Sequence, residues 1–160
     1  MEARIVSAGD FDVVGITTRT ANRDEMGPAG RIAKLWGEFY SSRVADRIPN
    51  RADGSLTVVY SDYESDKDGA YTYMIGARVT SVGAIPDGMS VKRVPLGKYA
   101  AFTSARGPLV QVVQNAWKLI WTLKKDQPGG DRSYNVDYEV YDERSRDPAN
   151  AQIDLYIGVK

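Results

Sequence analysis

The sequence predicts an α+β fold in which two βαββ repeats with pseudo-twofold symmetry form one antiparallel sheet of about eight strands, with the helices on one face. Three observations predict it. The 160 residues are enough for a single domain. Segments of about residues 1–82 and 88–160 show the same order of strand-like and helix-like patterns, and several aromatic and glycine positions recur in both. Each half alone would leave an apolar face exposed, so the two halves should pair.

The first repeat begins with a β-branched strand, FDVVGITTRT (11–20), and continues after a Gly-Pro break with the helix RIAKLWGEFY (31–40). Two further strand-like runs, LTVVYSDYES (56–65) and AYTYMIGARV (70–79), are joined by a polar turn. The helix carries apolar residues at the spacing of one helix face, namely Ile32, Leu35, Trp36 and Phe39.

The second repeat has the same order. A strand pair within SVKRVPLGKYAAFTSA (90–105) precedes the helix LVQVVQNAWKLIWTLKK (109–125), and a hairpin pair, YNVDYEVYDE (134–143) with AQIDLYIGVK (151–160), follows it. The apolar face of this helix is predicted to contain Val110, Val113, Trp117, Ile120 and Trp121.

The two repeats can be aligned residue by residue. The alignment matches Trp36 with Trp117, Tyr40 with Trp121, Tyr60 and Tyr63 with Tyr138 and Tyr141, and Ile75-Gly76 with Ile157-Gly158. An ordered set of matches is typical of an internal duplication, which would leave a groove between the halves. In this alignment Glu139 corresponds to Ser61, so a carboxylate occurs at this position in the second repeat only.

The composition excludes several classes of function. The chain has no Cys and no His, which excludes disulfides, Cys or His zinc sites and every Ser-His or Cys-His relay. Lys plus Arg and Asp plus Glu both total 21, so no basic footprint indicates direct nucleic-acid binding. Phosphate-loop and calcium-loop spacings are absent, so we predict no cofactor and no metal. No apolar run could span a bilayer, and we predict a cytoplasmic protein without a membrane partner.

The aromatic residues indicate a binding site. Rings attract positive charge through their quadrupoles, and a nearby carboxylate supplies a counter-ion, so this combination favours an organic cation as ligand. We expect Glu139 to be the counter-ion, with a pocket wall made of Trp36, Trp117, Tyr73, Tyr141, Phe39, Tyr156 and Trp121. The same aromatic residues on a helix stripe are also typical of plain core.

The position of Glu139 in its strand leaves two alternatives. Strict alternation puts Val136, Tyr138 and Val140 on one face, and Asp137, Glu139 and Tyr141 on the other. The simplest interpretation is that Glu139 faces solvent. The second face also contains a tyrosine, however, and a mixed face of carboxylates and tyrosines can line a groove.

The repeated unit, the LWGEF helix, the VYSDYESDKDGAYTYMIG hairpin and the C-terminal YNVDYEVYDERSRDPANAQIDLYIGVK resemble the GyrI-like (gyrase-inhibitor-like) effector-binding domain found in many AraC-type and MerR-type regulators. The resemblance covers nearly the whole chain, and its most specific marks are E-x-Y and the closing D-x-Y-I-x-V-K. It implies a central pocket that accepts lipophilic aromatic cations over a buried acidic residue, which maps onto Glu139. Because this conflicts with a solvent-facing Glu139, we expect a bulge or twist near Asp137 to turn it inward.

The resemblance also implies rival functions. No helix-turn-helix segment fits before Phe11 or after Lys160, so the chain resembles a stand-alone member that senses a small molecule for a protein partner, such as a regulator or a gyrase-like protein. Some GyrI-like proteins resemble hydrolases, in which case Glu139 with Tyr141 or Tyr156 would form the catalytic set. We expect the binding function, with no catalytic residues, and keep two alternatives, the hydrolase and a gyrase-inhibitor-like protein-interaction module.

Overall fold

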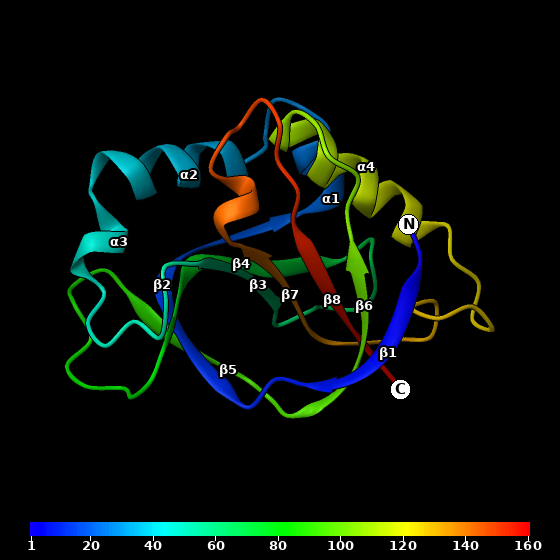
Figure 1. Ribbon diagram of the computed structural model, residues 1–160. Helices are drawn as coiled ribbons and strands as arrows, with labels where there is room; N and C mark the ends of the chain where they lie inside the picture. The colour runs from blue at the N-terminus through cyan, green and yellow to red at the C-terminus, as the bar shows by residue number, and fades with distance from the viewer.

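The computed structural model describes residues 1–160 and confirms the predicted α+β class, with one eight-stranded antiparallel sheet (Figure 1). The strands are β1 (Ala3–Ala8), β2 (Phe11–Ala21), β3 (Leu56–Ser61), β4 (Ala70–Val79), β5 (Ser90–Val94), β6 (Gly97–Thr103), β7 (Arg132–Tyr141) and β8 (Asp154–Val159). The helices are α1 (Asn22–Glu25), α2 (Ile32–Ser41), α3 (Val44–Arg47), α4 (Leu109–Trp121) and the short 3-10 helix η1 (Glu143–Ser145). No helix is long and apolar enough to cross a membrane.

The strand order, β1-β6-β8-β7-β3-β4-β2-β5, shows how the repeats combine. Strands β3 and β7 meet at the centre, where the two repeats join. Each outermost strand pairs with the opposite repeat: β1 pairs with β6, and β5 pairs with β2. The strands predicted within 90–105 therefore exist, but they pair with other strands and not with each other.

Two helices cover the pocket side of the sheet. Helix α2 buries Leu35 and Phe39, as its spacing predicts. Helix α4 buries Val112, Ala116, Trp117 and Ile120, so its buried face is rotated from the predicted one. Val110, which we expected in that face, is 71% exposed and lies at the rim of a pocket described below.

Both faces of the central strands are largely buried, whereas the outermost strands β1 and β5 expose many of their residues. The larger core lies between the helices and the sheet and includes Tyr60, Ile75 and Leu155. A smaller core lies on the opposite face and includes Phe11 and Tyr138. Figure 1 shows the cause: helices α2 and α4 lie above the central strands, while β1 and β5 curve below them. A sheet that curls in this way has little surface left for alternating polar residues.

Two details of the sequence alignment are wrong. Tyr60 lies in the core beneath the helices, whereas Tyr138 lies in the core on the opposite face, so the proposed match joins residues of opposite orientation. Glu139 likewise does not match Ser61, because Ser61 follows Tyr60 in β3 and points to the opposite face, whereas Glu139 lies on the face of Tyr60. The pairing of β7 with β8 does shift register between Arg132 and Asp137, but it is regular from Asp137 to Val140. Glu139 therefore reaches its face by ordinary alternation and not through a bulge.

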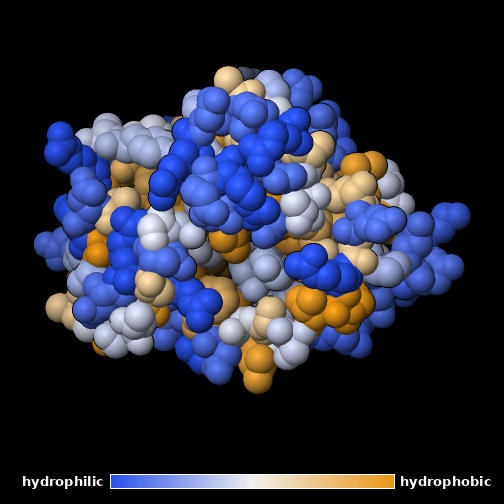
Figure 2. Space-filling view, viewed as in Figure 1, coloured by the Kyte–Doolittle hydropathy of each residue, from blue (hydrophilic) through white to orange (hydrophobic).

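The long connection between β7 and β8 presents mainly hydrophilic surface at the top of the space-filling view (Figure 2). Side-chain contacts order this connection, because the Arg144 guanidinium binds both Asp142 and Asp154, each at 2.8 Å. The side chain of Asp142 also accepts a hydrogen bond from the backbone N–H of Arg144, which starts η1. These contacts fix the entry into β8.

Candidate functional site

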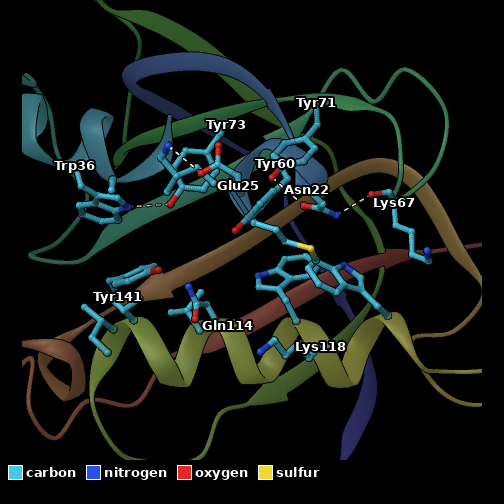
Figure 3. A pocket seen from close by; sticks show the side chains of 18 of the residues that line it. Asn22, Glu25, Trp36, Tyr60, Lys67, Tyr71, Tyr73, Gln114, Lys118 and Tyr141 are labelled. Atoms are coloured by element: carbon cyan, nitrogen blue, oxygen red, sulfur yellow. Dashed lines mark hydrogen bonds between the residues drawn. The ribbon is translucent and has the colours of Figure 1, made fainter. Parts of the chain in front are cut away.

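A pocket of about 750 Å³ lies between the helices and the sheet. Helix α4 forms one side, and the opposite side comes from α1, α2, β3 and β4 (Figure 3). Of the 21 lining residues, 15 are hydrophobic. The aromatic members are Trp36, Tyr40, Tyr60, Tyr63, Tyr71, Tyr73, Trp117, Trp121 and Tyr141, and the polar or charged ones are Asn22, Glu25, Lys67, Gln114, Lys118 and Arg132.

Glu139 lies directly behind the aromatic wall and is completely buried. Three side chains that line the pocket donate hydrogen bonds to its carboxylate: the Tyr60 hydroxyl at 2.8 Å, the Trp117 indole Nε1 at 2.6 Å and the Tyr141 hydroxyl at 2.8 Å. They come from β3, α4 and β7, so the carboxylate ties helix to sheet at the point where the two repeats meet. Because an indole nitrogen can only donate, the oxygen that Trp117 contacts must act as an acceptor.

No cation accompanies this carboxylate: none of the seven ion pairs of the protein involves Glu139. Burial raises the pKa of Glu139 above its usual value, because the ionised form loses its hydration. The three hydrogen bonds act in the opposite direction, and the nearby charge of Asp137 adds to the rise. The carboxylate is therefore held by neutral dipoles, in a site where its ionised form is less favourable than in water.

Asp137, two residues earlier on the same face of β7, is the opposite case. Its carboxylate is also completely buried but forms an ion pair with Arg132, whose Nη2 lies 2.6 Å from Oδ2. The Tyr63 hydroxyl and the backbone N–H of Gly158 donate to it as well. Asp137 is thus neutralised within the protein, whereas Glu139 is not, and this difference separates a structural carboxylate from a candidate binding group.

The aromatic wall is held rigidly by contacts among its own members. The Trp36 indole donates to the Tyr73 hydroxyl at 2.9 Å, the bond drawn on the left of Figure 3. The ring of Tyr60 packs against Tyr73 at 5.2 Å and against Trp117 at 4.8 Å between centroids. Rings fixed in this way offer their faces to a ligand at little cost in conformational entropy.

The structure places five of the eight predicted site residues in the pocket lining: Trp36, Tyr73, Trp117, Trp121 and Tyr141. Glu139 lies behind this lining. Phe39 does not reach the pocket; it is 1% exposed in the core and packs edge-on against Trp36. Tyr156 lies on the opposite face of the sheet, stacked on Tyr138 with centroids 4.6 Å apart. Tyr156 therefore cannot act with Glu139 in the catalytic set considered above, whereas Tyr141 contacts Glu139 directly.

Several pocket residues were missed in the sequence. Tyr60 and Tyr71 lie on the same sheet face as Tyr73. Alternation along their strands could have predicted that they share this face. Tyr63 follows Asp62, whose positive φ of 51° turns the chain at the end of β3, and no pattern predicts that its hydroxyl will reach Asp137. Arg132 gave no signal, because its partner depends on the irregular start of β7.

Comparisons with known proteins agree with this architecture. A family described as Cass2, integron-associated effector binding protein, matches residues 4–159. YobU of Bacillus subtilis (strain 168), whose name describes a candidate transcriptional regulator, is 31% identical over 91% of this chain and 90% of its own. The integron cassette protein VCH_CASS2 of Vibrio cholerae has a similar crystal structure, with a TM-score of 0.78, 28% identity and coverage of 99% of this chain and 96% of that one.

A third protein has a similar fold at lower sequence identity. The structure of SAV2435 bound to tetraphenylphosphonium matches with a TM-score of 0.74 and 18% identity, over 100% of this chain and 94% of that chain. At this level of identity the match shows the shared fold.

Proposed function

Because the chain belongs to the Cass2 family of integron-associated effector-binding proteins, we propose that its effector is a lipophilic aromatic cation held in the central pocket with Glu139 as counter-ion. One observation carries the proposal: a completely buried carboxylate receives three hydrogen bonds from the pocket wall and has no cationic partner. Burying an unpaired charge is costly, and a bound cation would offset that cost.

The charge of Glu139 can act on a ligand although Glu139 is not itself part of the lining. Tyr60 and Tyr141 direct their hydroxyl hydrogens toward the carboxylate, which leaves their oxygen lone pairs and ring faces for the pocket. Electrostatic attraction is also less screened in an apolar enclosure than in water. The carboxylate can therefore attract a cationic ligand electrostatically through the wall without touching it. This arrangement supports a counter-ion more than a catalytic nucleophile, which would need direct contact.

The ligand of a protein with the same fold supports the choice of a cation. SAV2435 has been solved with tetraphenylphosphonium, a cation in which four phenyl rings surround the charge. A ligand of this kind suits an aromatic pocket, because the charge is delocalised and weakly hydrated and the rings supply apolar contact area. We extend this ligand class to the present chain on the basis of its own pocket chemistry.

The test is a titration of intrinsic tryptophan fluorescence with tetraphenylphosphonium and with a neutral isostere that has carbon at its centre. Trp36, Trp117 and Trp121 all line the pocket, so occupancy should quench or shift their emission. We expect wild type to prefer the cation, and Glu139→Gln to weaken cation binding about a hundredfold, the size typical of truncating one partner of a desolvated charge pair. Binding of the neutral isostere should change little.

Glu38→Gln is the matched control, because Glu38 is an exposed carboxylate on α2 outside the pocket lining. It should bind the cation as wild type does. Equal weakening of the cation and the neutral isostere by Glu139→Gln would count against the counter-ion role, since it would indicate a change in pocket shape.

Two finer assignments belong to the same proposal. We place the chain with the GyrI-like effector-binding domains that its sequence resembles, and we expect it to report ligand occupancy to a protein partner, in line with the regulator name of YobU. A pull-down with and without tetraphenylphosphonium checks the second assignment. Capture that depends on ligand supports effector sensing, and capture indifferent to ligand supports a constitutive interaction of the gyrase-inhibitor kind.

A further inference from the structure

A second part of the pocket wall is incompletely hydrogen-bonded. Arg132 lines the pocket and is only 6% exposed. A guanidinium carries five N–H donors. The hydrogen bonds of Arg132 come from Nη2 alone, to Asp137 and to the Tyr63 hydroxyl. Its Nε is enclosed with no partner. The donors on Nε and Nη1 are therefore unused by the protein.

The surroundings of the guanidinium explain why the protein cannot satisfy these donors. Its central carbon lies 4.5 Å from the ring centroid of Tyr134, 5.5 Å from that of Trp117 and 5.8 Å from that of Tyr63. Ring faces attract the charge but do not replace an oxygen acceptor. Buried donors without acceptors are rare because each one costs free energy. Because Nε is closed off from the pocket as well, the free donor that a molecule in the pocket can reach is Nη1, which has no acceptor in the protein.

Arg132 is close enough to Glu139 for one ligand to contact Arg132 and lie against the wall that covers Glu139. Trp117 lies between them: its Nε1 donates to Glu139 at 2.6 Å, while its ring lies 5.5 Å from the Arg132 guanidinium. The carboxylates bonded to Trp117 and Arg132, namely Glu139 and Asp137, are two residues apart on one face of β7. One aromatic ligand lying across the Trp117 ring would therefore lie in front of Glu139 and contact Arg132.

We infer that the pocket selects aromatic cations that also carry an uncharged hydrogen-bond acceptor, such as a carbonyl oxygen, and that Arg132 binds this acceptor. The inference rests on the proposed function and narrows its ligand class. The acceptor should be uncharged because Asp137 already neutralises Arg132. A ligand carboxylate would gain little net attraction there and would face the negative charges of Asp137 and Glu139.

Three dyes that share one xanthylium cation test this selection. Tetramethylrosamine has no acceptor on its pendant ring, tetramethylrhodamine methyl ester has an ester carbonyl, and tetramethylrhodamine has a carboxylate. Dissociation constants are measured by fluorescence anisotropy at neutral pH. We expect wild type to bind the ester about tenfold more tightly than the rosamine, the gain typical of one hydrogen bond to a charged donor, and more tightly than the carboxylate.

Variants assign the preference to Arg132. Arg132→Lys keeps a cation for Asp137 but removes the Nε and Nη1 donors, so the ester should lose its advantage while rosamine affinity stays within about twofold. Glu139→Gln should weaken the rosamine and the ester together and preserve their ratio. Lys125→Gln is the matched control, since Lys125 is an exposed cation outside the pocket lining. Its removal should leave the ester advantage intact.

Each outcome has a defined meaning. Equal binding of rosamine and ester by wild type would overturn the inference and assign the free donors to water. If the carboxylate dye binds most tightly, the inference that the acceptor is uncharged is wrong. If none of the dyes binds, the proposed function fails together with this inference, whereas rosamine binding without an ester preference sinks the inference alone. The wild-type comparison decides even if Arg132→Lys does not fold.

Discussion

Two acidic residues on one strand face show how the environment of a single residue assigns its role. Asp137 has Arg132 on its own strand as a buried counter-ion, so its charge is balanced whether or not a ligand is present. Glu139 has only neutral donors from Tyr60, Trp117 and Tyr141. When the pocket holds no ligand, ionising Glu139 costs free energy, and a bound cation can offset that cost.

The pKa of Glu139 gives a pH dependence of binding with a definite sign. Because burial raises this pKa, the ligand-free protein holds Glu139 protonated at pH values below it, and a cation must displace that proton. The affinity for tetraphenylphosphonium, whose charge does not titrate, should therefore rise with pH by up to about tenfold per pH unit and become constant above the raised pKa. Fluorescence titrations over a pH series measure this.

Glu139→Gln is the control for the pH series, because it has no proton to release. Its weaker binding should be independent of pH over the same range. A wild-type affinity that is equally flat would mean that Glu139 does not change its charge when the cation binds, and the counter-ion role would have to be abandoned.

At the scale of the element, helix α2 depends on a residue outside itself for its first turn. Its N-cap, Arg31, provides no side-chain cap. The carboxylate of Glu25, in the preceding α1, accepts hydrogen bonds from the backbone N–H groups of Arg31 at 2.8 Å and Ile32 at 3.2 Å. Thr20 of β2 donates to the same carboxylate. Since Glu25 and Ile32 both line the pocket, this cap also fixes the edge of the binding site.

Glu25→Ala should lower the free energy of unfolding by about 1 kcal/mol, the usual cost of losing a helix cap. Urea denaturation measures the change. Asp24→Ala is the neighbouring control, because the Asp24 side chain in α1 accepts no hydrogen bond. This substitution should lower the free energy of unfolding by less than about 0.5 kcal/mol. Equal losses in the two variants would show that general charge near the helix, and not the cap, is responsible.

At the scale of the whole molecule, the two faces of the sheet have separate roles. The face beneath α2 and α4 carries the pocket and Glu139, and the face enclosed by β1 and β5 carries a second core. Tyr141 belongs to the first and Tyr156 to the second. Stability and ligand binding should therefore respond separately to substitutions on the two faces.

A pair of tyrosine variants checks this separation. Tyr156→Ala removes the stack on Tyr138 and should lower the free energy of unfolding by about 2 kcal/mol, with ligand affinity unchanged within about twofold. Tyr141→Phe removes a donor to ionised Glu139 and should weaken tetraphenylphosphonium about tenfold. Denaturation and fluorescence titration measure the two effects. A loss of affinity in Tyr156→Ala at temperatures where it is folded would mean that the faces are coupled.

Much of the fold could be predicted because its signals are local. The two main helices follow from the spacing of apolar residues such as Leu35 and Phe39, and the paired strands β3 with β4 and β7 with β8 follow each other in the chain. The partners of β1 and β5 could not be predicted, because they lie in the opposite repeat and no local pattern specifies them.

The candidate site was harder to predict for a different physical reason. Alternation correctly grouped Glu139 with Asp137 and Tyr141, but alternation cannot tell which face meets water when both faces are buried. For the same reason Tyr156 and Tyr141 could not be separated. Arg132 was missed because its contact with Asp137 depends on the register shift between them.

The exchange of the outermost strands has a consequence for synthesis of the chain. Strand β2 lacks its outer neighbour until β5 has been made, and Ala3 must wait for Phe102 before β1 can pair. Such long-range pairing slows folding, and a nascent chain that ends between the repeats has unpaired strand edges on both sides. The first strand therefore stays unpaired until β6 has been made, and the pocket is complete only once α4 and β7, which supply part of its lining, have also been made.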